Sequence, residues 1–132
     1  MEQRAAIWKL RPLVRGKVID KLFRQGDLHE LSRTVDDFVD NIAISNKSVD
    51  LTAATYQNSR VLLSKLVKYV AELEAYTGTE WGGDIIREVK IAGRALRLII
   101  PKGSMTSLQR EVIEGASRIA RSKGIRLIVA EF

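Results

Sequence analysis

The sequence has 132 residues, a formal net charge of +6, two prolines and no cysteine. This length suits a single domain, and the lack of cysteine excludes disulfides, thiolate catalysis and thiolate zinc sites. No apolar run reaches the roughly 20 residues of a membrane-spanning helix, and no signal peptide is visible. We expect one domain over residues 1–132, with residues 1–10 either part of it or an N-terminal extension.

The first predicted element is a helix over residues 11–24, whose apolar side chains recur at helical spacing. Pro12 suits its first turn and Gly26 its end. A polar loop at 27–33 separates it from two strands, predicted at 34–39 and 42–49 from their β-branched and aromatic residues. Asp40-Asn41 is the predicted hairpin turn between them, because both side chains tolerate positive φ.

A long helix is predicted over residues 53–76, and its buried stripe consists of Leu62, Leu66, Val70 and Leu73. A glycine-containing loop at 77–84 follows, and residues 85–91 form a short strand or an irregular segment. Arg94 to Ile100 is a strand that Pro101 ends. Thr106 and Gln109 resemble a capping box, so a helix begins there and buries a stripe that starts at Leu108.

The last predicted strand runs from Ile125 to Phe132, after a helix that ends near Ser122. The strand–helix–strand order at the C-terminus predicts two parallel strands. The whole order is α-β-β-α-β-α-β. The predicted fold class is therefore α/β or α+β, with a central mixed sheet flanked by helices.

Basic side chains are concentrated in residues 1–24, where seven lysines and arginines face only Glu2 and Asp20. A basic surface attracts phosphates, acidic partners or anionic membranes, although a plain solvated surface is an equally good interpretation. Asp20 is thus a lone carboxylate within a basic helix. His29 is the only histidine, which excludes a mechanism with two histidines, and we interpret it as a surface residue.

The predicted hairpin gathers the residues with catalytic chemistry. Ser45 and Lys47 are two apart on one strand, so they share a face, and Asp36 lies on the strand opposite. A carboxylate and a hydroxyl can bind a hard divalent cation, and an ammonium can stabilise charge on phosphorus during phosphodiester hydrolysis. The spacing alone favours a plainer interpretation, in which Asp36 is a turn residue and the other two lie on a solvated face.

The pattern of an aspartate, a turn and then a residue-x-lysine pair resembles the PD-(D/E)XK nuclease superfamily, which has the restriction-endonuclease fold. The segment from Val35 to Leu51 looks more narrowly like the active-site hairpin of C-terminal toxin domains from bacterial contact-dependent growth-inhibition (CdiA-type) proteins. In that family a serine commonly replaces the second acid. Residues 15–20, Arg-Gly-Lys-Val-Ile-Asp, resemble its first-helix motif. The similarity spans roughly residues 11–132.

The resemblance implies a role for each matching residue. Asp36 would be the principal metal ligand, Ser45 would stand in the place of the second acid, and Lys47 would be the catalytic lysine. Asp20 would be the acid from the helix, although the family usually has glutamate there. Asn46 also departs from the family, which usually has an apolar residue at that position. The implied cofactor is a divalent ion, namely Mg²⁺, Mn²⁺ or Zn²⁺.

The resemblance also implies a setting: a delivered toxin that hydrolyses DNA in the cytoplasm of a target bacterium, with transfer RNA as the alternative substrate. It implies a cognate immunity protein, and we expect that protein to be acidic. No membrane partner is expected for the folded domain. The rival interpretations are a non-catalytic nucleic-acid-binding module and a domain whose site has decayed. The candidate phosphate-binding residues, which could equally form a wet helix surface, are Arg11, Arg15, Lys17, Gln57, Arg60 and Lys68.

Overall fold

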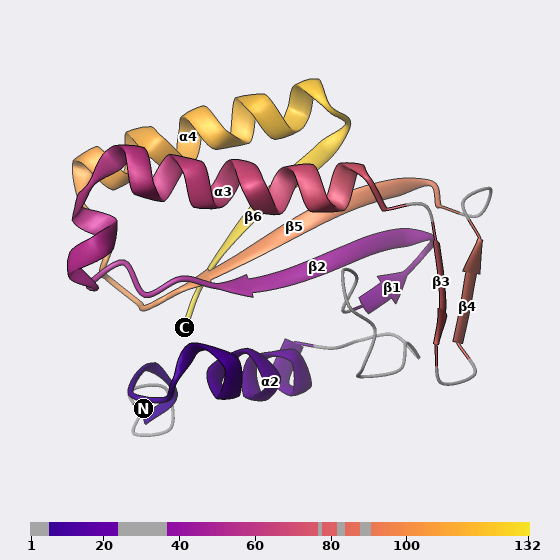
Figure 1. Ribbon diagram of the computed structural model, residues 1–132, viewed down its shortest axis with the longest axis horizontal. Coiled ribbons are helices and arrows are strands. Elements are labelled where there is room, and N and C mark those ends of the chain that lie inside the picture. Colours follow the sequence, from indigo (N-terminus) through magenta and orange to yellow (C-terminus); the bar gives the residue numbers. More distant parts are fainter. Residues whose placement is uncertain (1–5, 24–36, 77, 82–83, 88–90) are drawn as a thin grey trace.

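The computed structural model describes residues 6–23, 37–76, 78–81, 84–87 and 91–132 (Figure 1). For residues 13, 19–23, 37, 78–81 and 84–87 the description is limited to the backbone. The elements are α2 (Pro12–Phe23), β1 (Asp37–Val39), β2 (Ile42–Ser48), η1 (Ala54–Gln57), α3 (Ser59–Glu74), β3 (Gly78–Trp81), β4 (Asp84–Arg87), β5 (Gly93–Ile100), α4 (Ser107–Ser122) and β6 (Ile125–Glu131).

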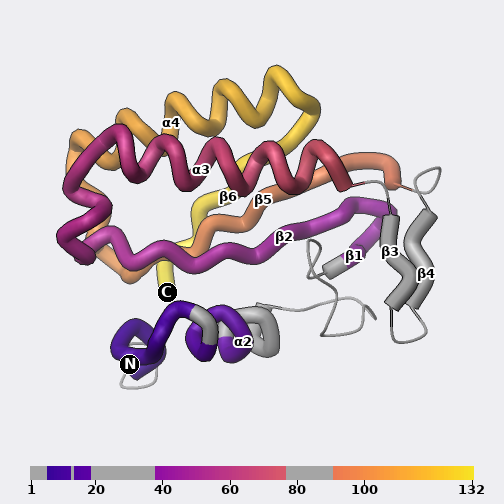
Figure 2. Tube along the Cα trace, in the orientation of Figure 1, coloured from indigo at the N-terminus to yellow at the C-terminus, as the bar shows by residue number. Residues whose placement is uncertain are grey.

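A four-stranded sheet with the order β1-β2-β5-β6 forms the centre of the molecule. β1 is antiparallel to β2, whereas β2, β5 and β6 are parallel to one another. Helices α3 and α4 cover one face of this sheet and α2 lies on the other side, as the ribbon and the tube both show (Figures 1 and 2). The predicted mixed sheet with flanking helices is confirmed, including the parallel pair at the C-terminus.

The turn between β1 and β2 forms where the sequence predicted it. Asp40 and Asn41 both have positive φ, at 52° and 64°, which is the conformation that a two-residue hairpin turn requires. β2 matches its predicted range closely. The described part of β1 begins at Asp37, so residues 34–36 of the predicted strand lie outside the described residues.

The start of the long helix differs from the prediction. A 3-10 turn, η1, occupies residues 54–57, and α3 begins only after Asn58. The Asn58 side chain accepts hydrogen bonds from the backbone N–H groups of Arg60 and Val61, at 3.0 and 3.4 Å, and therefore acts as the N-cap. The predicted stripe of four aliphatic residues on α3 is buried, as expected.

The loop predicted at residues 77–84 is wrong where β3 forms, whereas β4 confirms the short strand that was one alternative for residues 85–91. β3 and β4 form a separate antiparallel pair in which Gly78 is opposite Arg87 and Trp81 is opposite Asp84. The loop was predicted because this segment contains several glycines. Its strand-forming residues, among them Thr79 and Ile85, favour an extended conformation once they can pair.

Helix α4 has the predicted capping box, with Thr106 and Gln109 bonded to each other's backbone N–H groups at 3.1 Å. The predicted burial of Leu108 is wrong, because this side chain is 55% exposed. Its neighbour Gln109 is buried instead. The Gln109 amide donates hydrogen bonds to the carbonyl oxygens of Leu51 and Tyr56, at 2.9 and 3.1 Å, so the helix is rotated to satisfy a polar side chain within the core.

The two faces of the sheet have unequal cores. On the side of α3 and α4, β5 contributes Leu96, Leu98 and Ile100, all fully buried. On the side of α2 the buried apolar cluster is small and centres on Ile7 and Ile99. No helix in the described ranges is both long and apolar enough to cross a membrane.

Candidate active site

Ser45 and Lys47 lie on the same face of β2, as the two-residue period predicted. This face points toward α3, because Ala43 on the same side belongs to a buried cluster with residues of α3. In the parallel register, Ser45 is next to Leu96 and Lys47 is next to Leu98 of β5. Ser45 is only 2% exposed, and within the described part of the chain no hydrogen bond engages its hydroxyl.

The Lys47 ammonium lies against an aromatic ring. Its Nζ is 5.4 Å from the centroid of the Tyr69 ring, and Lys65 Nζ is 5.3 Å from the same centroid. Both distances are within the range of a cation–π interaction. Among the described residues, neither lysine forms an ion pair. The sequence analysis missed Tyr69 and Lys65, although their spacing of four residues places them on one side of α3.

The Tyr69 hydroxyl is held in its neutral form. The pKa of Tyr69 is raised to about 12, chiefly by burial and then by Tyr56 and Glu72, whereas the positive charge of Arg15 acts in the opposite direction. Tyr69 therefore remains a phenol rather than a phenolate at neutral pH. Its ring presents an uncharged, half-buried surface to the two lysines.

The two predicted carboxylate ligands are less completely described. Asp36 lies outside the described residues, and Asp20 is described only as a backbone position within α2. That helix packs through Arg15, whose Nε donates to the Ser48 hydroxyl at 3.0 Å, and Ser48 lies on the opposite face of β2 from Lys47. Ser45 and Lys47 therefore lie together on the α3 side of the sheet, whereas α2 lies on the other side. A metal site that also includes Asp20 would have to extend around the edge of β2.

Arg15 differs from the other predicted phosphate-binding residues. It is only 7% exposed, and its guanidinium carbon lies 5.0 Å from the centroid of the Trp8 ring. The Gln57 amide donates to the carbonyl oxygens of Leu51 and Ala53, at 2.8 and 3.1 Å, and therefore holds its own loop. The remaining members of the predicted set are exposed: Arg11, Lys17, Arg60 and Lys68.

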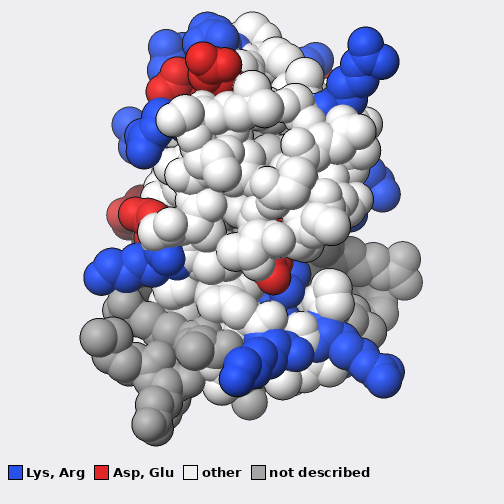
Figure 3. All heavy atoms as spheres, turned by 90° about the vertical axis from the view of Figure 1, so that its left-hand side faces the viewer, with Lys and Arg blue, Asp and Glu red and all other residues white. Residues whose placement is uncertain are grey.

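The basic side chains do not form one broad patch on the face seen in Figure 3. Lysines and arginines lie in several separate places of that view, with uncharged surface between them. Two positive charges meet at the Tyr69 ring instead, those of Lys47 and Lys65.

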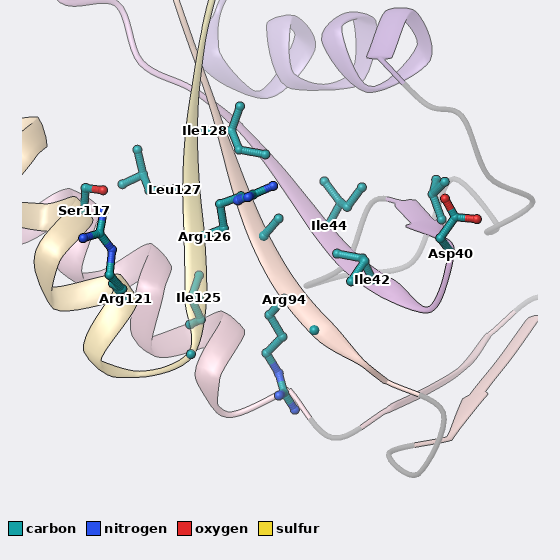
Figure 4. Close-up of a pocket in the computed structure, with 14 residues that line it drawn as sticks. Asp40, Ile42, Ile44, Arg94, Ser117, Arg121, Ile125, Arg126, Leu127 and Ile128 are labelled. Carbon is teal, nitrogen blue, oxygen red and sulfur yellow. The ribbon is translucent and has the colours of Figure 1, made fainter.

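A separate hollow lies near the turn of the hairpin. It is lined by Ile42 and Ile44 of β2, by Arg126 and Ile128 of β6, and by the end of α4, among others (Figure 4). Ser45 and Lys47 are not among its lining residues. Asp40 is the only carboxylate among the described residues that line it, so this hollow offers less hydrolytic chemistry than the α3 side of β2.

The described donors supply only part of a site for the implied metal ion. Within the described ranges, no three His, Asp or Glu side chains converge on one point. The Ser45 hydroxyl has no hydrogen bond in that part of the chain, and an oxygen donor of this kind fits a hard divalent cation together with carboxylates. Asn46, the departure between the two catalytic candidates, is buried and accepts a hydrogen bond from Arg97 at 3.3 Å.

The comparisons with known proteins agree with the fold. The family model described as "CDI toxin restriction endonuclease-like domain" matches residues 15–130. The fold is similar to a solved chain of a CdiA-CT/CdiI toxin and immunity complex from Yersinia pseudotuberculosis, with a TM-score of 0.73 and 21% sequence identity. The match covers 89% of this chain and 97% of that chain. No curated protein matches the sequence.

Proposed function

The chain belongs to the family of CDI toxin restriction endonuclease-like domains, and from this membership we propose that it is a metal-dependent endonuclease that hydrolyses phosphodiester bonds of DNA in target bacteria. The observation that carries the proposal is the pairing of Ser45 with Lys47 on one face of β2. Ser45 is buried and Lys47 is half-buried, whereas Leu96 and Leu98 are their neighbours on β5. Polar side chains in such a place have a reason beyond the core, and catalysis supplies one.

Metal binding is assigned to Asp36, Asp20 and Ser45. All three offer oxygen, which suits Mg²⁺ or Mn²⁺ better than a thiolate-preferring ion. When bound, such an ion polarises the phosphoryl group and lowers the pKa of a water molecule. Ser45 supports this assignment because its hydroxyl is held in place by a rigid strand and makes no hydrogen bond within the described residues.

Lys47 acts on the phosphate itself. Its ammonium forms no ion pair among the described residues, so its positive charge is available to orient the attacking water or to stabilise charge that develops on a phosphoryl oxygen. Water attacks phosphorus, the phosphorus–oxygen bond to the leaving strand breaks, and the leaving oxygen takes up a proton. The contact with Tyr69 restrains the flexible lysine side chain, which helps to orient its ammonium.

We also propose delivery of this domain into the cytoplasm of a target cell and inhibition by a cognate immunity protein. The similar solved chain comes from a complex of toxin and immunity protein, which supports such a partner. The net charge of +6 favours an acidic one, because complementary charge accelerates encounter.

The decisive experiment incubates the purified domain with plasmid DNA and, separately, with transfer RNA. Each reaction is run with Mg²⁺, Mn²⁺ or Zn²⁺ and with a chelator. Lys47→Ala and Asp36→Ala are compared with Lys123→Ala, a matched control that removes an exposed lysine paired with Glu74 at the far end of α3. We expect cuts in the plasmid that require the metal, disappear in the first two variants and persist in the control.

Other results would change the proposed substrate, function or site. Cleavage of transfer RNA alone would replace the substrate and keep the mechanism. Binding without cleavage under every metal would identify a non-catalytic module. Cleavage that survives both Lys47→Ala and Asp36→Ala would show that the active site lies elsewhere.

A further inference from the structure

Arg15 is a buried cation that lacks a carboxylate partner among the described residues. The residue as a whole is only 7% exposed, yet its one hydrogen bond in the described part of the chain joins Nε to the Ser48 hydroxyl at 3.0 Å. Burial of a charge is costly unless the charge is paired. An anion bound to Arg15 would offset this cost in free energy.

Two neighbours hold the guanidinium in a fixed plane. Trp8 packs over it, with the guanidinium carbon 5.0 Å from the ring centroid, and Ser48 accepts from Nε. Trp8 is itself anchored, because its Nε1 donates to the carbonyl oxygen of Phe132 at 2.8 Å. The two terminal amino groups are left without a hydrogen-bond partner in the described residues, and together they form the planar fork that binds two oxygens of one phosphate.

Arg15 reaches β2 next to the catalytic candidates along the chain, but from the α2 side of the strand. Ser48 follows Lys47 directly on β2, and the charge of Arg15 is felt by the hydroxyl of Tyr69, whose ring contacts Lys47. We propose that Arg15 binds one phosphate group of the nucleic-acid backbone next to the bond that is cut. This inference rests on the proposed nuclease function and assigns to Arg15 a role distinct from that of the exposed arginines.

Trp8 provides a direct reporter for this site. The chain has two tryptophans, so Trp81→Phe leaves Trp8 as the only one. In that background, a short DNA duplex is added in the presence of chelator, which prevents cleavage, and both Trp8 fluorescence and duplex anisotropy are followed. Inorganic phosphate is titrated in parallel. We expect both ligands to change Trp8 emission.

Variants distinguish the effect of the Arg15 guanidinium on duplex affinity from the effect of positive charge in general. Arg15→Gln should weaken duplex binding about tenfold to a hundredfold, as expected for loss of charge-assisted hydrogen bonds, and should lower the salt dependence by about one phosphate contact. Arg118→Gln removes an exposed arginine of α4 and should change affinity much less. Arg15→Lys keeps the charge without the fork and should recover only part of the affinity; it also serves if Arg15→Gln does not fold.

The possible results are distinct. Duplex binding that leaves Trp8 emission unchanged, or equal losses in Arg15→Gln and Arg118→Gln, would overturn the assignment. A response of Trp8 to inorganic phosphate without any duplex binding would support an anion site at Arg15. In that case only the proposed nuclease function would be contradicted.

Discussion

β2 and β5 are neighbouring parallel strands whose side chains share one face of the sheet, yet they present different chemistry there. β5 contributes Leu96 and Leu98, both fully buried. At the positions beside them β2 contributes Ser45 and Lys47. The two strands lie against the same helix layer, so burial alone does not explain the difference.

The comparison separates residues that stabilise the fold from residues that cost stability. Leucines in β5 gain free energy from burial. The hydroxyl of Ser45, which has no hydrogen bond within the described residues, and the half-buried ammonium of Lys47 gain little free energy from burial or lose some. Proteins retain such residues chiefly at functional sites. The polar positions of β2 are therefore expected to affect activity, and the apolar positions of β5 to affect stability.

The largest effect is expected from Lys47→Ala, which removes the ammonium that β2 contributes to the reaction. The rate of cleavage should fall about 10²- to 10⁴-fold, while the melting temperature changes little. Single-turnover cleavage and thermal unfolding of the same preparation measure both quantities. A variant that remains fully active would remove the functional contrast between the two strands.

Leu98→Ala tests the other strand. Leu98 is fully buried in a cluster with Leu62 and Leu66, so its truncation should lower the free energy of unfolding by about 2–5 kcal/mol. Leu108→Ala is the matched control, since that leucine is 55% exposed. It should change stability by less than about 0.5 kcal/mol. Denaturant unfolding of both variants decides whether burial sets the difference.

Ser45→Ala sharpens the contrast within β2. Removal of a buried hydroxyl that has no hydrogen bond in the described residues should leave stability unchanged or raise it by about 1 kcal/mol. Cleavage should nevertheless fall, by about tenfold or more, if the hydroxyl contributes to the metal site. Ser122→Ala, on the exposed end of α4, is the control. A loss of stability in Ser45→Ala without loss of activity would assign Ser45 to the core.

The smallest effect concerns Tyr69, which covers the polar part of this face. Its pKa is raised to about 12, against about 10 for an unfolded tyrosine. Between these values the unfolded chain loses its proton first, so stability falls as pH rises from about 10 to about 12, and below that window Tyr69 contributes no pH dependence. Unfolding as a function of pH for the wild type and Tyr69→Phe measures this. Equal slopes for the two proteins would contradict it.

Local signals were sufficient for most of the fold. The hairpin turn at Asp40-Asn41 and the capping box at Thr106 were predicted because their physics lies within a few residues of chain. β3 was missed, and β4 was only one of two alternatives, since two short strands are stable only through pairing with each other. Leu108 was placed inside wrongly, because a hydrogen-bonding requirement of Gln109 decides how α4 is rotated.

The sequence by itself determined that Ser45 and Lys47 share a face, because side chains on a strand alternate with a period of two. Tertiary structure alone decided what that face meets: Tyr69 and Lys65 of α3, which are close to β2 only after the helix packs on the sheet. It also decided that Arg15 is buried against Trp8 rather than exposed like Arg11. Contacts between distant segments depend on how the layers pack, and no local pattern of residues encodes that packing.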